Sequence, residues 1–244
     1  MSGLGIIGGS GLTSLSDMEG TEKHRLETPY GQTSAPPVSG RLGDLKLVFV
    51  ARHGDQHSIA PHRVNYQANI WALKELGVER VLAINTVGGI NQSLQPPCVG
   101  LPDQIIDYTW GRNHTFFDAP PGNVEHVDFT KPYSTEMREL ALSAASRASI
   151  RLVDGGTYGV TQGPRLESAA EIDRMERDGC DYVGMTGMPE AALARELKLK
   201  YACCVVVVNM AAGRGGGIHD EIYKNLEMGM EHVHLLLKGL VESL

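Results

Sequence analysis

The sequence lacks an excess of positive charge. Its 22 lysine and arginine residues are outnumbered by 29 aspartate and glutamate residues, so the formal net charge is −7 at pH 7. A surface that binds nucleic acid or an anionic membrane normally carries a clear basic excess. The composition therefore predicts no nucleic-acid partner and no membrane partner. It favours small molecules as partners, because a small anion needs only a local basic site.

Long apolar runs and patterned cysteines are also missing. The longest apolar run, YACCVVVV, falls far short of the roughly 18 residues of a membrane-spanning helix. The four cysteines show neither CxxC spacing nor the density of a disulfide-rich secreted protein. The start, MSGLGIIGGSGL, has no basic segment followed by a long apolar core, as a secretory signal would. These absences together predict a reduced, cytoplasmic protein.

What the chain does contain is an alternation of short β-rich runs and helical patterns, from residues 4–9 to residues 219–241. The four valines at 205–208 show no polar alternation, which is typical of a strand covered on both faces of a mostly parallel sheet. Such alternation indicates an α/β fold, and no repeat or linker divides it, so we predict one domain over residues 1–244. A looser region from Gly111 to Pro132 is predicted to be a long excursion with a role in function or subunit contact.

Polar side chains collect where the predicted strands end. The turn GIIGGSGL surrounds Ser10 with glycines, whose backbone amides can approach an anion closely. Arginine offers a bidentate fork for phosphate, and imidazole can add a second donor. Four strand ends of this kind suggest one phosphate held by several segments. Beyond Ser10, these strand ends supply Arg52, His53, Asn85, Thr86, Met185 and Thr186.

Some of these motifs also have plainer interpretations. The glycine turn has Ser14 where a dinucleotide fingerprint needs its last glycine, and no Gly-Lys-Ser/Thr follows as in a P-loop; a tight strand-to-loop turn would explain it. An arginine such as Arg52 is also common on surface turns. His232 and His234, two apart on a predicted final helix that packs on the core, point to different faces, so no metal site is predicted there.

Five segments in this order resemble the methylthioadenosine phosphorylase branch of the trimeric purine nucleoside phosphorylases: GIIGGSGL, ARHGDQHSIAPHRVNYQANIWALKELG, NTVGGI, TQGPRLESAAE and VGMTGMPEAALARE. The resemblance covers most of the chain. It implies a single α/β domain with a mixed central β-sheet flanked by helices, and phosphorolysis of a purine nucleoside with inorganic phosphate as co-substrate. It also implies no cofactor, no metal and a homotrimer with sites near subunit boundaries. By the same resemblance Met185 packs on the ribose, and phosphate is bound by Ser10, Arg52, His53, Asn85, Thr86 and Thr186.

The strand end VNMAA departs from the adenine-cleaving pattern of this family. Members that cleave 6-aminopurines resemble Thr-Asp-x-Asp here, whereas this chain has Asn209 and Ala211 in place of the two aspartates, with Met210 between them. An asparagine carbonyl can accept from a protonated purine N7 while its NH2 donates to a 6-oxo oxygen. Without the resemblance, Asn209 would be interpreted as an amide capping a loop.

Glu167 in GPRLES also favours a 6-oxopurine as the base. Its position resembles one that is small in the adenine-cleaving branch and acidic in the inosine- and guanosine-cleaving branch. A carboxylate accepts the N1 proton of a 6-oxopurine, whereas N1 of adenine is itself an acceptor. The plainer interpretation is a solvated carboxylate in the first turn of a helix. With the resemblance, Asn209 and Glu167 are predicted to be the catalytic, base-reading residues, and Met210 and Ala211 to line the base pocket.

Three positions are predicted to surround the 5′ group of the sugar. They are His219 in GGIHDEI, Ile222 one turn along, and His126 in EHVDFTKPY, which resembles a position that reaches the site from the neighbouring subunit. Most of the chain resembles methylthioadenosine phosphorylase, but the predicted base pocket suits a 6-oxopurine. The expected substrate is therefore 5′-methylthioinosine, and the expected products are hypoxanthine and 5-methylthioribose 1-phosphate. An inosine/guanosine phosphorylase, a methylthioadenosine phosphorylase and a nucleoside-binding sensor remain the alternatives.

Overall fold

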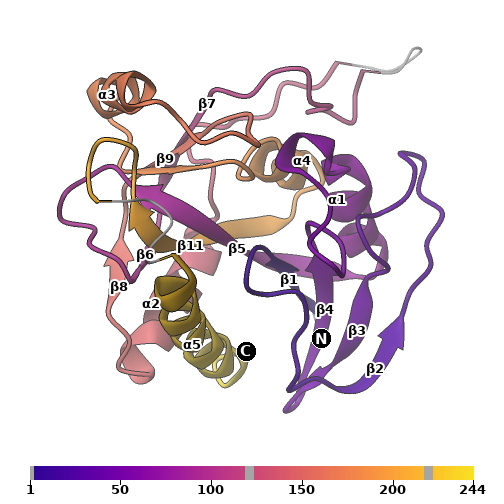
Figure 1. Ribbon diagram of the computed structural model, residues 1–244. Coiled ribbons are helices and arrows are strands. Elements are labelled where there is room, and N and C mark those ends of the chain that lie inside the picture. Colours follow the sequence, from indigo (N-terminus) through magenta and orange to yellow (C-terminus); the bar gives the residue numbers. More distant parts are fainter. Residues whose placement is uncertain (1–2, 119–123, 217–221) are drawn as a thin grey trace.

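The computed structural model describes residues 3–118, 124–216 and 222–244 (Figure 1). Within these ranges 11 strands form one mixed sheet, which confirms the predicted α/β class. The strands are β1 (Gly3–Gly8), β2 (Glu19–Lys23), β3 (Val38–Leu42), β4 (Leu45–Ala51), β5 (Val78–Gly89), β6 (Cys98–Leu101), β7 (Gln104–Asp107), β8 (Leu152–Asp154), β9 (Thr157–Val160), β10 (Tyr182–Gly184) and β11 (Lys200–Met210). The helices are the short 3-10 turn Pro61–Arg63 and α1 (Tyr66–Glu75), α2 (Thr135–Arg147), α3 (Ala169–Arg177), α4 (Glu190–Glu196) and α5 (Ile222–Val241).

Strand β5 is the branch point of the sheet. One of its edges pairs in parallel with β11 along most of its length, and the other pairs in parallel with β1 as far as Ala83. Antiparallel β10 joins that second edge only at Gly88. Residues 84–87 therefore have no ladder partner on this side. Ligands in open α/β sheets bind outside the carboxyl ends of strands where neighbouring strands part, so this gap is where a site is expected.

The valine run lies in β11 and is buried on both faces, as predicted. Successive side chains of a strand point to opposite faces, and here they enter two different hydrophobic clusters. Cys204 and Val206 pack with α2 and α5, while Val205 and Val207 pack with α1 and α4. The absence of polar alternation in the sequence thus reflects helices on both sides of the sheet.

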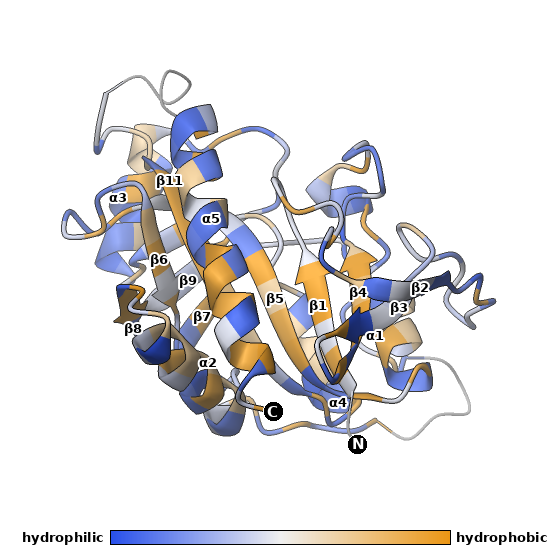
Figure 2. Ribbon diagram, turned by 90° about the horizontal axis from the view of Figure 1, so that it is seen from below, coloured by the Kyte–Doolittle hydropathy of each residue, from blue (hydrophilic) through white to orange (hydrophobic). Residues whose placement is uncertain are grey.

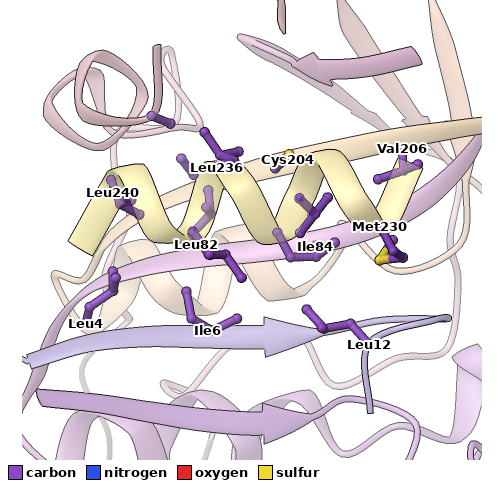
Figure 3. Close-up of a cluster of buried hydrophobic side chains, with 14 of the residues drawn as sticks. Leu4, Ile6, Leu12, Leu82, Ile84, Cys204, Val206, Met230, Leu236 and Leu240 are labelled. Carbon is purple, nitrogen blue, oxygen red and sulfur yellow. The ribbon is translucent and has the colours of Figure 1, made fainter. Parts of the chain in front are cut away.

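Helix α5 covers one face of the sheet beside α2. Figure 3 shows its Met230, Leu236 and Leu240 against strand residues that include Leu82 and Ile84. The prediction that the final helix packs on the core is therefore confirmed. In Figure 2 the central strands β1 and β5 are coloured mostly hydrophobic, whereas the edge strand β2 is hydrophilic, and all of its residues are exposed.

The excursion from Gly111 to Pro132 has no helix or strand in its described residues, 111–118 and 124–132. Its Arg112 is nevertheless buried, and the Arg112 side chain donates to the main-chain carbonyls of Gln162, after β9, and Met185, after β10. Across the part of the chain that the structure describes, no helix has the length and hydrophobicity needed to cross a membrane.

Candidate active site

A cavity of about 470 Å³ opens at the gap in the sheet. It is lined by the ends of several strands and by the first turn and a half of α5. Most of the sequence-predicted site residues lie on its wall, although they come from segments far apart in the chain. They are Ser10, Arg52, His53, Glu167, Met185, Thr86, Thr186, Asn209, Ala211 and Ile222.

Arg52 is fully buried at the end of β4, so it is not a surface-turn arginine. Its Nε and Nη2 donate to the two carboxylate oxygens of Glu190 at 2.7 and 2.8 Å. Its Nη1 donates at 2.9 Å to the carbonyl of Ile84, the residue after the last pairing of β1 with β5. Burial alone would lower the pKa of Arg52, but the Glu190 carboxylate offsets this and raises that pKa above its usual value. The cation is therefore held permanently charged, with one Nη1 hydrogen still available.

Asn85 stands behind the cavity rather than on its wall. It is almost fully buried, and its Oδ1 accepts from Arg52 Nη2 at 3.2 Å. Its Nδ2 donates to the hydroxyl oxygen of Thr186 at 2.7 Å. Because that bond uses a lone pair of Thr186, the Thr186 hydroxyl hydrogen is free to donate toward the cavity. Asn85 thus orients two predicted phosphate ligands.

Two histidines flank the glycine turn. The ring of His53 lies 4.7 Å from that of His57, and His57 Nε2 shares a 2.8 Å hydrogen bond with the hydroxyl of Ser10. His53 Nδ1 is 2.8 Å from the carbonyl of Ile59, and a carbonyl only accepts, so Nδ1 carries the proton. Burial, and then the neighbouring Arg52, lower the pKa of His53 to about 4. At neutral pH His53 is therefore uncharged, with Nε2 as an acceptor.

The pKa of His53 predicts a pH dependence of stability. Its value in the folded protein, about 4, lies below the ordinary 6.5, so between these pH values the unfolded chain binds more protons. We expect the free energy of unfolding to be fully retained above pH 6.5 and to decrease as the pH falls toward 4. In urea unfolding over this range, the free energy of unfolding should fall less steeply with pH for His53→Gln than for the wild type. The difference in slope should correspond to the uptake of at most one proton per molecule on unfolding. Equal slopes for the two proteins would contradict this assignment.

The other wall of the cavity carries the predicted base-reading residues. Asn209 is half-buried at the end of β11, and its Nδ2 donates to the carbonyl of Met210 at 2.8 Å. Since a carbonyl cannot donate, this contact fixes which side of the amide is NH2 and leaves Oδ1 free for a ligand donor. Glu167 is half-buried and precedes Ser168, the N-cap of α3, so it is not in the first turn of that helix.

The remaining predicted residues lie elsewhere. Met210 adjoins the base wall through its carbonyl but does not itself line the cavity. His126 is exposed and does not line the cavity of its own chain. His219 lies outside the described residues. His232 and His234 lie on α5, and among the described residues no three His, Cys, Asp or Glu side chains are grouped so as to hold a metal.

Three further residues belong to this site and were not predicted from the sequence. Glu190 stands in an otherwise apolar and small stretch, MPEAALA, and such an isolated carboxylate is a signal for a buried ion pair. His57 lies four residues after His53 in ARHGDQHS. Leu226 shares the cavity wall with Ile222 because both face the same side of α5, four residues apart.

A sequence model described as the phosphorylase superfamily matches residues 4–242. The chain belongs to the phosphorylase superfamily. This membership agrees with the glycine turn, the buried arginine and the strand-end cavity. Together with the similarity to the nucleoside phosphorylases described next, it confirms the predicted class of enzyme, a pentosyltransferase of the purine nucleoside phosphorylase type.

Several members of the superfamily are similar over most of their length. The chain is 54% identical over 212 residues to the probable S-methyl-5′-thioinosine phosphorylase of Xanthomonas campestris pv. campestris, covering 87% of this chain and 85% of that protein. It is 42% identical over 245 residues to the 6-oxopurine nucleoside phosphorylase of Pyrococcus furiosus, covering 98% and 91%. The methylthioadenosine phosphorylase of Schistosoma mansoni in complex with tubercidin matches with a TM-score of 0.93 and 32% identity, covering 99% and 91% of the two chains.

Proposed function

We propose that this phosphorylase cleaves 5′-methylthioinosine with inorganic phosphate, giving hypoxanthine and 5-methylthioribose 1-phosphate. The observation that carries the proposal is the pair of Asn209 and Glu167 on one cavity wall. Asn209 offers a carbonyl for a protonated N7 and one remaining NH2 hydrogen for a 6-oxo oxygen, while Glu167 offers an acceptor for N1–H. This polarity matches a 6-oxopurine and mismatches adenine at N1. The similarity to a probable S-methyl-5′-thioinosine phosphorylase and to a 6-oxopurine nucleoside phosphorylase supports the same base.

Phosphate is proposed to lie among Ser10, Arg52, His53, Thr86 and Thr186. The Arg52 charge is balanced by Glu190, so the remaining Nη1 hydrogen and the hydroxyls supply directed donors rather than a large net positive charge. His53 Nε2, an acceptor at neutral pH, suits the P–OH group of hydrogen phosphate. Such a set holds the anion in one orientation, which is what positioning a nucleophile requires.

The reaction needs no nucleophile from the protein. A phosphate oxygen forms a bond to the anomeric carbon as the C1′–N9 bond breaks through an oxocarbenium-like sugar, and the electron pair of that bond passes to the purine. Negative charge therefore develops on the base in the transition state. N7 takes up a proton from solvent as the bond breaks. Asn209 then accepts from this N7–H through Oδ1 and donates to the 6-oxo oxygen, where the remaining charge is delocalised.

An apolar part of the cavity wall supports the proposal that the substrate carries a 5′-methylthio group. Ile222 and Leu226 lie at the start of α5, and Leu226 Cδ1 would be only 2.9 Å from a Cβ atom placed on Gly11. The helix therefore closes over the glycine turn with hydrocarbon rather than with hydrogen-bonding groups. A thiomethyl group gains from contact with such a surface, whereas a 5′-hydroxyl needs a polar partner.

The test is phosphate-dependent base release from methylthioinosine, methylthioadenosine, inosine and guanosine, compared as kcat/KM under one set of conditions, with phosphate-free reactions as the control. Methylthioinosine is expected to lead. Inosine or guanosine in first place would contradict the proposed 5′ group and retain the base assignment. Methylthioadenosine in first place would contradict the base assignment. Base release without phosphate would contradict phosphorolysis itself.

The proposal extends to a cytoplasmic homotrimer of single-domain chains, residues 1–244, without cofactor or metal. Exposed apolar side chains next to and within the excursion support a subunit contact: Trp110, directly before it, is 71% exposed, and Val124 within it is 73% exposed. His126, two residues beyond Val124, would then reach a neighbouring site. Sedimentation at the mass of three chains tests the assembly, and a monomer with full activity would contradict it.

A further inference from the structure

Thr161 directly follows β9 and has no assigned role, yet its hydroxyl donates to Glu167 Oε1 at 2.6 Å. We propose that Thr161 is the positioning residue that fixes the Glu167 carboxylate for recognition of a 6-oxopurine. The inference rests on the proposed function, because it assigns to Thr161 the orientation of the carboxylate that reads N1–H. Thr161 does not line the cavity and is not proposed to touch the substrate.

The backbone of Thr161 is held on both sides. Its N–H donates to the carbonyl of Gly184 at 2.8 Å, at the end of β10. Arg112, which is buried, donates through Nη2 to the carbonyls of Thr161 and Gln162 at 3.2 and 2.9 Å. Because its backbone is anchored in this way, the Cα and Cβ atoms of Thr161 are held in place. The Thr161 hydroxyl is therefore a rigid reference point beside the cavity.

Glu167, in contrast, sits on a segment whose neighbours are exposed. Among the residues that the structure describes, the bond from Thr161 is the one hydrogen bond made by its carboxylate. A glutamate side chain with three rotatable bonds loses rotamer freedom when a ligand orders it, which weakens binding. Thr161 removes part of that freedom before the ligand arrives. It also occupies Oε1, which leaves Oε2 for the base.

The same hydroxyl has an alternative acceptor when Glu167 is changed. The carbonyl of Gly184 lies 3.3 Å from Thr161 Oγ1, so the hydroxyl is not left without a partner in a Glu167 variant. Substitution of Glu167 therefore tests the carboxylate alone, and substitution of Thr161 tests its positioning.

The experiment measures the base preference, defined as kcat/KM for methylthioinosine divided by kcat/KM for methylthioadenosine. Thr161→Val keeps the shape and removes the hydroxyl, and we expect it to lower this ratio about tenfold, the effect of losing one charge-assisted hydrogen bond. Thr161→Ser retains the hydroxyl and should keep the ratio within about twofold of the wild type. Since both substrates are assayed on one preparation, the ratio does not depend on the fraction of folded enzyme. Thr161→Ala provides a second deletion with less steric demand.

Glu167→Ala in the same assay separates the positioning role of Thr161 from the proposed base recognition by Glu167. A lowered ratio for Glu167→Ala with an unchanged ratio for Thr161→Val and Thr161→Ala would overturn the role of Thr161 and leave the proposed base recognition intact. Equal losses on both substrates for the Thr161 variants would also overturn it, because a purely structural residue acts on both. An unchanged ratio for Glu167→Ala would overturn the base recognition and this inference together.

Discussion

The double variant Asn209→Asp/Glu167→Ser is expected to shift the base preference toward 6-aminopurines by about three orders of magnitude. Each substitution replaces a matched buried polar contact of hypoxanthine with a mismatched one, at roughly 1–3 kcal/mol per contact, and 1.4 kcal/mol corresponds to a factor of ten. An aspartate at 209 accepts from the exocyclic amine of adenine. A serine at 167 removes the carboxylate that repels adenine N1.

The geometry of Asn209 makes this variant informative. Its Nδ2 donates to the Met210 carbonyl at 2.8 Å, which an aspartate cannot do, so the carboxylate has to turn away from that oxygen. Absolute rates are therefore expected to fall for both substrates, and the ratio of the two kcat/KM values is the proper measurement. The two single variants serve as controls. Because both side chains are proposed to contact one base, their effects are expected to couple, and the three orders of magnitude is the value for simple addition of the two. An unchanged ratio in the double variant would rule out base reading by this pair.

Glu190→Ala is expected to lower the free energy of unfolding by about 3–5 kcal/mol, since removing one partner of a buried ion pair leaves the other charge uncompensated. Glu190 is only 1% exposed and binds Arg52 through both oxygens. The hydroxyl of Tyr201 donates to the same carboxylate at 2.8 Å, so this group also loses its acceptor. In the phosphorylase, the KM for phosphate should rise as well, because Arg52 loses the group that orients it.

The control for Glu190→Ala is an exposed ion pair of the same chain. Lys238 and Asp17 approach to 3.2 Å with both side chains more than half exposed, so Lys238→Ala should change the free energy of unfolding far less than Glu190→Ala does. Urea unfolding of the wild type and the two variants provides the comparison. A loss for Glu190→Ala as small as that for Lys238→Ala would show that the buried pair does not hold this part of the structure.

Much of the fold could be predicted because local patterns carry it. The uninterrupted valines of β11 required burial on both faces, and that requirement is met by helices on either side of the sheet. The strand ends could be found in the same way, because glycine and polar residues interrupt the apolar runs there. Ser10, Arg52 and Thr186 therefore stood out in the sequence, and the structure brings them to one cavity.

The partners of these residues could not be predicted, because they come from distant segments. Arg52 meets a carboxylate 138 positions away, and Asn85 meets a hydroxyl 101 positions away. Local periodicity contains no information on such pairs. Asn85 lies inside β5, which continues to Gly89, and not at a strand end as the sequence had suggested. It stands behind the cavity wall.

The sequence by itself determined the α/β class, the buried strands and the chemical types of the residues at the strand ends, since these follow from hydrophobic periodicity and from side-chain chemistry. Only the tertiary structure decided what each residue does there. The gap between β1 and β10 along one edge of β5 leaves residues 84–87 without a strand partner on that edge, and the cavity opens there. The proton on His53, the direction of the Thr186 hydroxyl and the orientation of the Asn209 amide are each fixed by a hydrogen-bond partner. A hydrogen-bond direction depends on where the partner atoms lie in space, which residue identity alone does not specify.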